Sequence, residues 1–205
     1  MNQEAITVYA WSHASRAERC IWTLNETGLE HEVVRLKPRP DTPEYAKLKS
    51  INPAAKIPTV THGDRVLTES VPTCEYLARL KPQARLLPET DAESHEYGVL
   101  MHYLLTEVEG YLWTATQAST LSAMYAWPEG TTEFAVKMTQ KGFRNLTHHV
   151  GTDYACCGRF TIADILLAQL ASWAAGFKLE LPDNVAALTA SSFARDTLPD
   201  TMKRR

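Results

Sequence analysis

The sequence predicts an α/β domain followed by an all-α domain. Two observations support this fold class. Segments with the β-branched and aromatic composition of strands end before about residue 70, and after "LKPQARLLPETD" only helical periodicity is left. We expect a βαβ-α-ββα domain over residues 1–82, a linker over residues 83–90 and an α-helical domain over residues 91–205. The length of 205 residues fits two small domains, and a hydrophobic content of 44% is enough for packed cores.

The first strand and helix are predicted from "AITVYAWSHASRAE". Ala5–Ala10 has the composition of a buried strand. Ser15 and Glu18 match the S-x-x-E capping box, so we expect the first helix to begin at Ser15. Gly28 is a suitable C-terminal stop, and His31–Leu36 is the next predicted strand.

The rest of the first domain is predicted to be a short helix, a hairpin and a longer helix. Asp41 or Thr42 would cap the short helix, which extends to about Lys49. Proline is tolerated in the first turn of a helix, which suits Pro72 in a helix capped by Ser70. The two strands of the hairpin are expected at Ile57–Thr61 and Arg65–Thr68.

The second half of the chain shows helical patterns only. Apolar residues recur at helical spacing from about Asp91 to Trp113, and Gly142–Val150 belongs to a further predicted helix. In "RFTIADILLAQLASWA", Thr161 and Asp164 fit a capping box with Asp in place of Glu. We therefore expect a helix to start directly after Thr161.

The composition excludes several function classes. The net charge of −3 gives no basic field for nucleic acid, and no apolar run reaches the roughly 18 residues of a membrane span. The N-terminus lacks the pattern of a signal peptide, which predicts a cytoplasmic protein. The four cysteines are sparse and poorly spaced for zinc, so we expect reduced thiols and no metal site.

Four segments resemble the glutathione transferase family, in its order and spacing. They are the strand leading to "SHASRAER", then "NPAAKIPTV", "LTESVPTCEYL" and "FTIADI". The resemblance covers nearly the whole chain and points to a bacterial-type member of unassigned class with a serine-type active site. It implies a thioredoxin-like N-terminal domain and a detoxifying transferase, in which the thiol of glutathione attacks a small hydrophobic electrophile. Glutathione would be a co-substrate, with no bound cofactor.

The resemblance also implies where glutathione binds. It implies a cis bond at Ile57–Pro58, which would leave the Ile57 backbone free to pair with a peptide. Ser70 and its helix N-terminus would bind the α-carboxylate of the γ-glutamyl group, and Glu69 would pair with its ammonium group. Lys56 could reach the glycyl carboxylate. The alternatives are a purely structural helix start at Glu69 and Ser70 and a solvated surface charge at Lys56.

A thiol with a pKa of about 8.5 must be stabilised as the thiolate, and a hydroxyl at a helix N-terminus can donate to it. Ser15 lies four residues before Arg19, as the serine-type classes have it, and is the first candidate. Ser12 and Tyr9 are alternatives, as are backbone N–H groups alone. Ser15 could equally be only a helix cap, and Tyr9 only a core aromatic. No cysteine stands near Ala14, which argues against a mixed-disulfide mechanism.

The site for the electrophile is less specified by the sequence. Trp11, His13 and Tyr111 are candidates to line it, although aromatic residues at helical spacing are more often core residues. The resemblance implies a homodimer, while neither nucleic acid nor a membrane is an expected partner. Two other functions stay open: reduction of peroxides or disulfides with glutathione, and non-catalytic binding of glutathione or of a protein.

Overall fold

The computed structural model describes residues 4–37 and 41–203 and folds into two compact units. Unit 1 comprises Met1–Leu87 together with Arg195–Arg205, and unit 2 comprises Pro88–Ala194. The sequence-based division assigned everything after residue 91 to the helical domain, whereas the C-terminal segment of the chain groups with the first unit.

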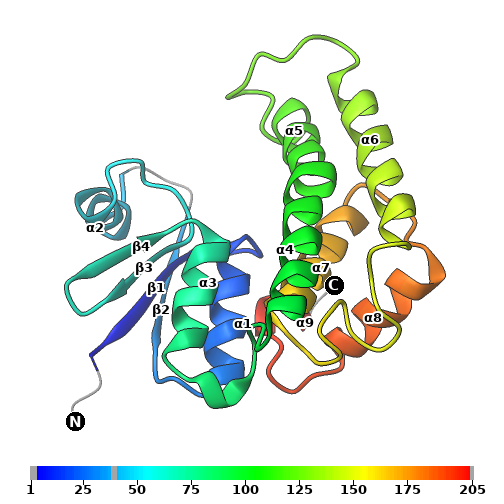
Figure 1. Cartoon of the computed structure of the whole chain (residues 1–205). Coiled ribbons are helices and arrows are strands. Elements are labelled where there is room, and N and C mark those ends of the chain that lie inside the picture. Colours follow the sequence, from blue (N-terminus) through cyan, green and yellow to red (C-terminus); the bar gives the residue numbers. More distant parts are fainter. Residues whose placement is uncertain (1–3, 38–40, 204–205) are drawn as a thin grey trace. The chain divides into compact units, whose positions relative to one another are not determined.

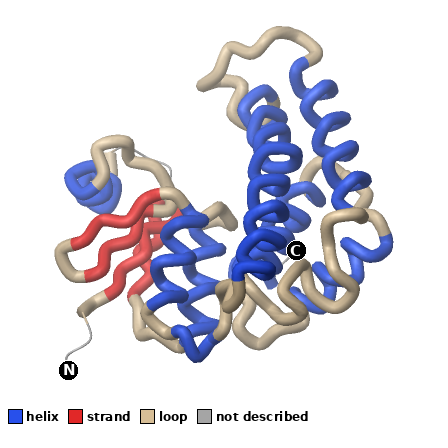
Figure 2. The backbone as a smooth tube through the Cα atoms, in the orientation of Figure 1, coloured by secondary structure: helices blue, strands red, loops and turns tan. Residues whose placement is uncertain are grey.

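Unit 1 is built on a four-stranded mixed sheet (Figure 2). The strand order is β2-β1-β3-β4, where β1 pairs in parallel with β2 and antiparallel with β3, and β3 and β4 form the predicted hairpin. This is the predicted βαβ-α-ββα order. The strands are β1 (Ile6–Trp11), β2 (Glu32–Leu36), β3 (Thr59–His62) and β4 (Arg65–Thr68).

Three helices flank this sheet: α1 (Ala17–Thr27), α2 (Pro43–Ile51) and α3 (Ser70–Arg79), the last followed by the 3₁₀ turn η1 (Pro82–Ala84). Helices α1 and α3 lie side by side (Figure 1). Tyr9 packs with Leu48 of α2, while its neighbours Val8 and Ala10 point to the opposite face because side chains alternate along a strand. Both faces of β1 are therefore covered.

Two helix starts differ from the prediction. Helix α1 begins at Ala17 rather than Ser15, and Glu18 does not complete the capping box because its carboxylate binds Arg35, at 2.6 Å. Ser70 is the first residue of α3 rather than its cap. The cap position is held by Glu69, whose φ of 64° and ψ of 126° lie outside the helical region.

The C-terminal segment is held against α1 by polar contacts. Arg195 donates from Nε to Oε1 of Glu26 at 2.6 Å, and Asn25 donates from Nδ2 to the carbonyl of Thr197 at 2.8 Å. The short helix α9 (Asp200–Lys203) follows. These contacts explain why the end of the chain belongs to unit 1.

Unit 2 is helical throughout its regular structure. Helix α4 (Asp91–Tyr103) continues through the π-helical segment η2 (Leu104–Glu109) into α5 (Gly110–Ala118) without a break in helical backbone angles. The remaining helices are α6 (Thr131–Leu146), α7 (Ile162–Ala175) and α8 (Asp183–Phe193). Helix α6 ends at Leu146, so the helix predicted to reach Val150 is four residues shorter at its C-terminus.

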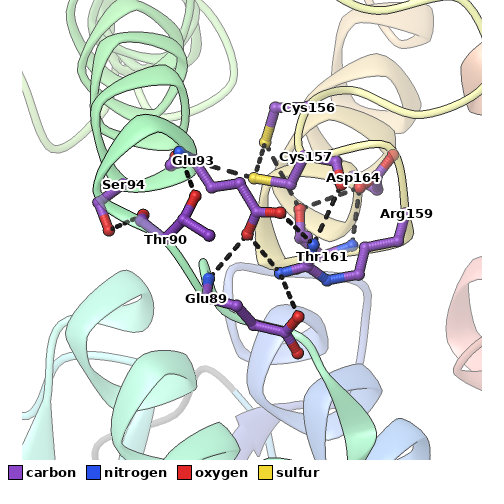
Figure 3. A network of polar contacts seen from close by, with 9 residues as sticks. All are labelled: Glu89, Thr90, Glu93, Ser94, Cys156, Cys157, Arg159, Thr161 and Asp164. Carbon is purple, nitrogen blue, oxygen red and sulfur yellow. Dashed lines mark hydrogen bonds and ion pairs between the residues drawn. The ribbon is translucent and has the colours of Figure 1, made fainter.

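The predicted capping box before α7 is present (Figure 3). The Thr161 hydroxyl accepts from the N–H of Ala163 at 3.3 Å, and Oδ2 of Asp164 accepts from the N–H of Thr161 at 2.8 Å. The other Asp164 oxygen accepts from the N–H of Ala155 at 2.7 Å. Burial raises the pKa of Asp164 to about 6 against the effect of these hydrogen bonds.

A second polar contact connects the loop before α7 with the first turn of α4 (Figure 3). Both terminal nitrogens of Arg159 donate to the carboxylate of Glu93, at 2.8 Å each. Cys156 and Cys157 lie beside this ion pair as free thiols, and burial raises the pKa of both. Neither thiol is activated, and we assign this cluster to the packing of unit 2. Within residues 4–37 and 41–203, no helix combines the length and apolar character needed to cross a bilayer.

Candidate glutathione site

The strand register brings three predicted site segments to one edge of the sheet. Tyr9 of β1 is opposite Thr59 of β3, and Thr59 is opposite Thr68 of β4. The end of β1, the start of β3 and the end of β4 therefore lie at the same edge. Three predicted site segments are directly adjacent to these strand ends in the sequence. The loop with Ser12 and Ser15 follows β1, Ile57–Pro58 precedes β3, and Glu69–Ser70 follows β4.

The N-terminus of α3 is also the point where α1 contacts it. Nη1 of Arg19, in the first turn of α1, donates to Oγ of Ser70 at 3.0 Å. Both residues are buried, with 1% and 7% of their surfaces exposed. Because the Ser70 oxygen accepts from Arg19, its own proton is left to donate elsewhere. Sequence reasoning missed Arg19, since nothing local distinguishes a buried arginine from a solvated one at the start of a helix.

Glu69 differs from Ser70 in being exposed to solvent. Its backbone carbonyl accepts from the N–H of Thr73 at 3.1 Å, which starts the helical hydrogen bonds of α3. Glu69 directly precedes Ser70, whose hydroxyl is buried, and lies at the N-terminus of α3, the positive end of the helix dipole. A negative side chain and an anion-binding helix start are thus adjacent, which suits a zwitterionic ligand.

The loop between α2 and β3 is fixed by Asn52. Its side chain accepts from the N–H of Ala54 at 3.1 Å and donates to Oγ1 of Thr59 at 2.9 Å, while that hydroxyl donates to the carbonyl of Lys56 at 2.7 Å. The Lys56 side chain is exposed. The Ile57–Pro58 peptide bond is cis, as expected. Strand pairing begins only at Thr59, so the Ile57 backbone takes no part in the sheet.

The candidate activating hydroxyls occupy different environments. Ser12 is exposed, and its N–H extends the sheet by donating to the carbonyl of Leu36 at 2.8 Å. Ser15 is half-buried and lies two residues before α1, where its hydroxyl accepts from the N–H of Ala17 at 3.3 Å. Tyr9 is 7% exposed in an apolar cluster with Leu36 and Leu48. Burial, and secondarily the charge of Glu32, raise the pKa of the Tyr9 phenol.

Two of the three candidate residues for the electrophile site lie in unit 1. Trp11 is half-buried and stacks on Tyr45 of α2, with ring centroids 6.5 Å apart and an interplanar angle of 15°. His13 is exposed. Tyr111 belongs to unit 2, where its ring meets that of Phe134 edge to face at 6.3 Å. Sequence reasoning missed Tyr45, which adds an aromatic surface beside the end of β1.

The cysteines of unit 1 are buried where α1 contacts α3. Cys20 lies inside α1, fully buried, and its sulfur is 3.8 Å from that of Cys74 in α3. The hydrogen bond with Cys74 and burial raise the pKa of Cys20 well above its ordinary value. In the part of the chain that the structure describes, no cluster of three or more His, Cys, Asp or Glu side chains could hold a metal ion.

Comparisons with known proteins point to one family. Residues 4–79 match the family profile described as glutathione S-transferase, N-terminal domain. A probable maleylacetoacetate isomerase of Caenorhabditis elegans is 36% identical over 89 residues, which cover 43% of this chain and 40% of that protein. The matched part is therefore less than half of that relative. A probable maleylacetoacetate isomerase of Vibrio cholerae serotype O1 is 23% identical over 182 residues, covering 86% of this chain and 85% of that protein.

The fold is shared with solved structures over nearly the whole chain. A theta class glutathione S-transferase from the citrus canker pathogen Xanthomonas axonopodis pv. citri, solved with glutathione bound, superposes with a TM-score of 0.78 at 22% identity, covering 98% of this chain and 99% of that one. The predicted thioredoxin-like domain followed by a helical region is thereby confirmed.

Proposed function

Because residues 4–79 match the N-terminal domain of the glutathione S-transferase family, we propose that the chain binds reduced glutathione at the described edge of the sheet and uses its thiolate to attack a small electrophile. The observation that carries this proposal is the convergence of three segments at one edge: the loop after β1, the loop before β3 and the start of α3. Each supplies a different kind of group to a peptide ligand.

The binding groups match the chemistry of glutathione part by part. The Ser70 hydroxyl and the first N–H groups of α3 bind the α-carboxylate of the γ-glutamyl residue, and the exposed Glu69 carboxylate pairs with its ammonium group. The backbone of Ile57 pairs with the peptide backbone of the ligand, since the sheet leaves it unused. Lys56 is the cation for the glycyl carboxylate.

The thiol is activated from the loop between β1 and α1. Ser15 already accepts a hydrogen bond from the first residue of α1, so its hydroxyl proton is directed to another acceptor and stands at the positive end of the helix dipole. A donor in this place stabilises the thiolate and lowers the pKa of the thiol. The sulfur then forms a bond to an electrophilic carbon, and the leaving group departs with its electron pair or, in an addition, water supplies a proton.

Two measurements test this proposal. Calorimetric titration with glutathione should detect binding, and no heat at millimolar ligand would refute the site. The ultraviolet absorbance of the bound thiolate against pH gives its pKa. Ser15→Ala should raise that pKa by about one to two pH units, the equivalent of one hydrogen bond to a charged group. Ser50→Ala, an exposed serine of α2, is the control and should leave it unchanged. If Ser12→Ala raises the pKa and Ser15→Ala does not, Ser12 is the donor.

The similarity to two proteins named as probable maleylacetoacetate isomerases favours a second activity of the same site. A glutathione thiolate that adds reversibly to an activated cis double bond allows rotation before it is eliminated. We propose such isomerisation as the alternative to transfer, ahead of peroxide or disulfide reduction and of non-catalytic binding. A panel of aryl halides, epoxides, cis-enones and peroxides distinguishes these reactions, since only the isomerase regenerates free glutathione at each turnover.

We propose that the protein is cytoplasmic and forms a homodimer. The proposed electrophile site includes Trp11 and His13. Light scattering measures the oligomeric state directly. The stacked Trp11 and Tyr45 rings offer an apolar surface beside the end of β1, which supports an aromatic or otherwise hydrophobic electrophile.

A further inference from the structure

A single guanidinium group holds both ends of the loop that carries Ser12 and Ser15. Arg35, near the end of β2, donates from Nη1 to the carbonyl of Trp11 at 3.0 Å. It also donates from Nη1 to Oε1 of Glu18 at 2.6 Å and from Nη2 to Oε2 at 3.3 Å. Trp11 is the last residue of β1 and Glu18 lies in the first turn of α1, so the loop begins and ends on Arg35.

The ion pair is buried on the side of the carboxylate. The Glu18 side chain has no exposed surface, whereas 31% of that of Arg35 is exposed. The same carboxylate accepts from the Thr201 hydroxyl of α9 at 2.5 Å. A buried carboxylate that accepts several charge-assisted or short hydrogen bonds is fixed in position, unlike one partner of a surface pair.

The two serines lie very close to these fixed points. Ser12 follows Trp11 directly, and its N–H donates to the carbonyl of Leu36 at 2.8 Å. The carbonyl of Ser15 accepts from the N–H of Glu18 at 3.1 Å. Any displacement of Glu18 therefore moves the backbone of Ser15, and any displacement of the Trp11 carbonyl moves Ser12.

We propose that Arg35 is a positioning residue for thiolate activation, with Glu18 as its buried counter-charge and Thr201 as the contact that connects the C-terminal helix to the site. The inference rests on the proposed function. Arg35 acts through the loop hydroxyl: among the described residues its hydrogen bonds go to Trp11 and Glu18, and none goes to the proposed binding groups Lys56, Ile57, Glu69 and Ser70. Its loss should therefore affect the chemical step more than the binding of glutathione.

The test compares Arg35→Met with Arg65→Met. Arg65 is an arginine of the same sheet that pairs with Glu4 at 3.4 Å and contacts nothing in the loop, and 63% of its side chain is exposed. We expect Arg35→Met to raise the pKa of the bound thiol and to lower kcat by about 10- to 100-fold, the cost of a misplaced catalytic group. The affinity for glutathione, measured by calorimetry, should stay within about threefold of the wild type. Arg65→Met should match the wild type in all three quantities.

A double-mutant cycle separates positioning from general destabilisation. The double variant combines Arg35→Met with the serine variant that raises the thiol pKa. Its thiol pKa should be close to that of the serine variant alone, because both changes remove the same hydrogen bond. Additive effects on the thiol pKa would overturn the inference, as would an unchanged pKa and kcat in Arg35→Met. If Arg35→Met does not fold, Thr201→Val serves instead, and a thiol pKa equal to that of the wild type overturns the inference.

The proposed function and the positioning role of Arg35 are refuted by different outcomes. Absence of glutathione binding by the wild type refutes the proposed function and the role of Arg35 with it. Binding by the wild type together with an unshifted thiol pKa in the Arg35 and Thr201 variants refutes only the positioning role.

Discussion

Gly142 of α6 is the position at which a single added methyl group should disturb unit 2 most directly. A Cβ atom built on Gly142 would lie 2.3 Å from the carbonyl oxygen of Glu107 and 3.2 Å from Cγ2 of Val108. Both neighbours belong to the π-helical segment, and the oxygen is a backbone atom that cannot turn aside. The close approach also lets the Tyr103 hydroxyl donate to the carbonyl of Gly142 at 2.9 Å.

The expected cost of Gly142→Ala follows from these contacts. Alanine gains about 1 kcal/mol over glycine in a helix interior. Overpacking of this kind costs about 1–3 kcal/mol, and loss of the Tyr103 hydrogen bond costs about 1 kcal/mol more. The sum is a net loss of about 1–3 kcal/mol in the free energy of unfolding.

Gly98→Ala is the matched control. Gly98 lies in α4, and a Cβ built there meets nothing within 4 Å, so this substitution should stabilise the protein by about 0.5–1 kcal/mol. Urea unfolding followed by circular dichroism measures both variants against the wild type. The reasoning is refuted if Gly142→Ala is as stable as Gly98→Ala, because the separation of α6 from the π-helical segment would then differ from the structure.

Two further predictions concern Asp164 and Glu69. Burial raises the pKa of Asp164 to about 6. Between about pH 4 and pH 6 the native chain therefore binds a proton that the unfolded chain has released. The free energy of unfolding should fall by about 3 kcal/mol as the pH rises through that window. Asp164→Asn should lack this slope in urea titrations at several pH values, and equal slopes would contradict the assignment. Glu69→Gly should stabilise the chain by up to about 2 kcal/mol, because relief of the positive φ (about 1–3 kcal/mol) is offset in part by the entropy cost of glycine (about 0.5–1 kcal/mol). It should nevertheless weaken glutathione binding by about tenfold or more through loss of the carboxylate. Ala55→Gly, at a φ of 49°, is its control and should stabilise without that loss; equal affinities of both variants would exclude Glu69 from the site.

Among the S/T-x-x-D/E patterns before helices, the one at Thr161 forms a capping box and the one at Ser15 does not. Thr161 and Asp164 satisfy each other, and the second oxygen of the Asp164 carboxylate accepts from the nearby N–H of Ala155. At Ser15 and Glu18 the same local pattern fails. Glu18 is bound instead by Arg35 and by Thr201, which are 17 and 183 residues away in the chain.

The difference between local patterns and contacts of distant residues also explains which other features could be predicted from the sequence. The strands, the hairpin and most helices follow from periodicity and turn residues, which are local properties. Arg19 as the donor to Ser70, and the grouping of the C-terminal segment with unit 1, depend on contacts between distant residues. No window of the sequence contains that information.

The start of α3 shows how a failed local prediction can indicate function. A serine at the start of a helix ordinarily caps it and itself has extended backbone angles. Here Glu69 occupies the cap position at a φ of 64°, which costs about 1–3 kcal/mol for a residue with a side chain, and its carboxylate makes no capping hydrogen bond. A glycine would remove that cost. Glu69 therefore keeps a side-chain carboxylate next to Ser70 although glycine would suit the backbone better. An adjacent carboxylate and hydroxyl can recognise a ligand that has an ammonium group next to a carboxylate.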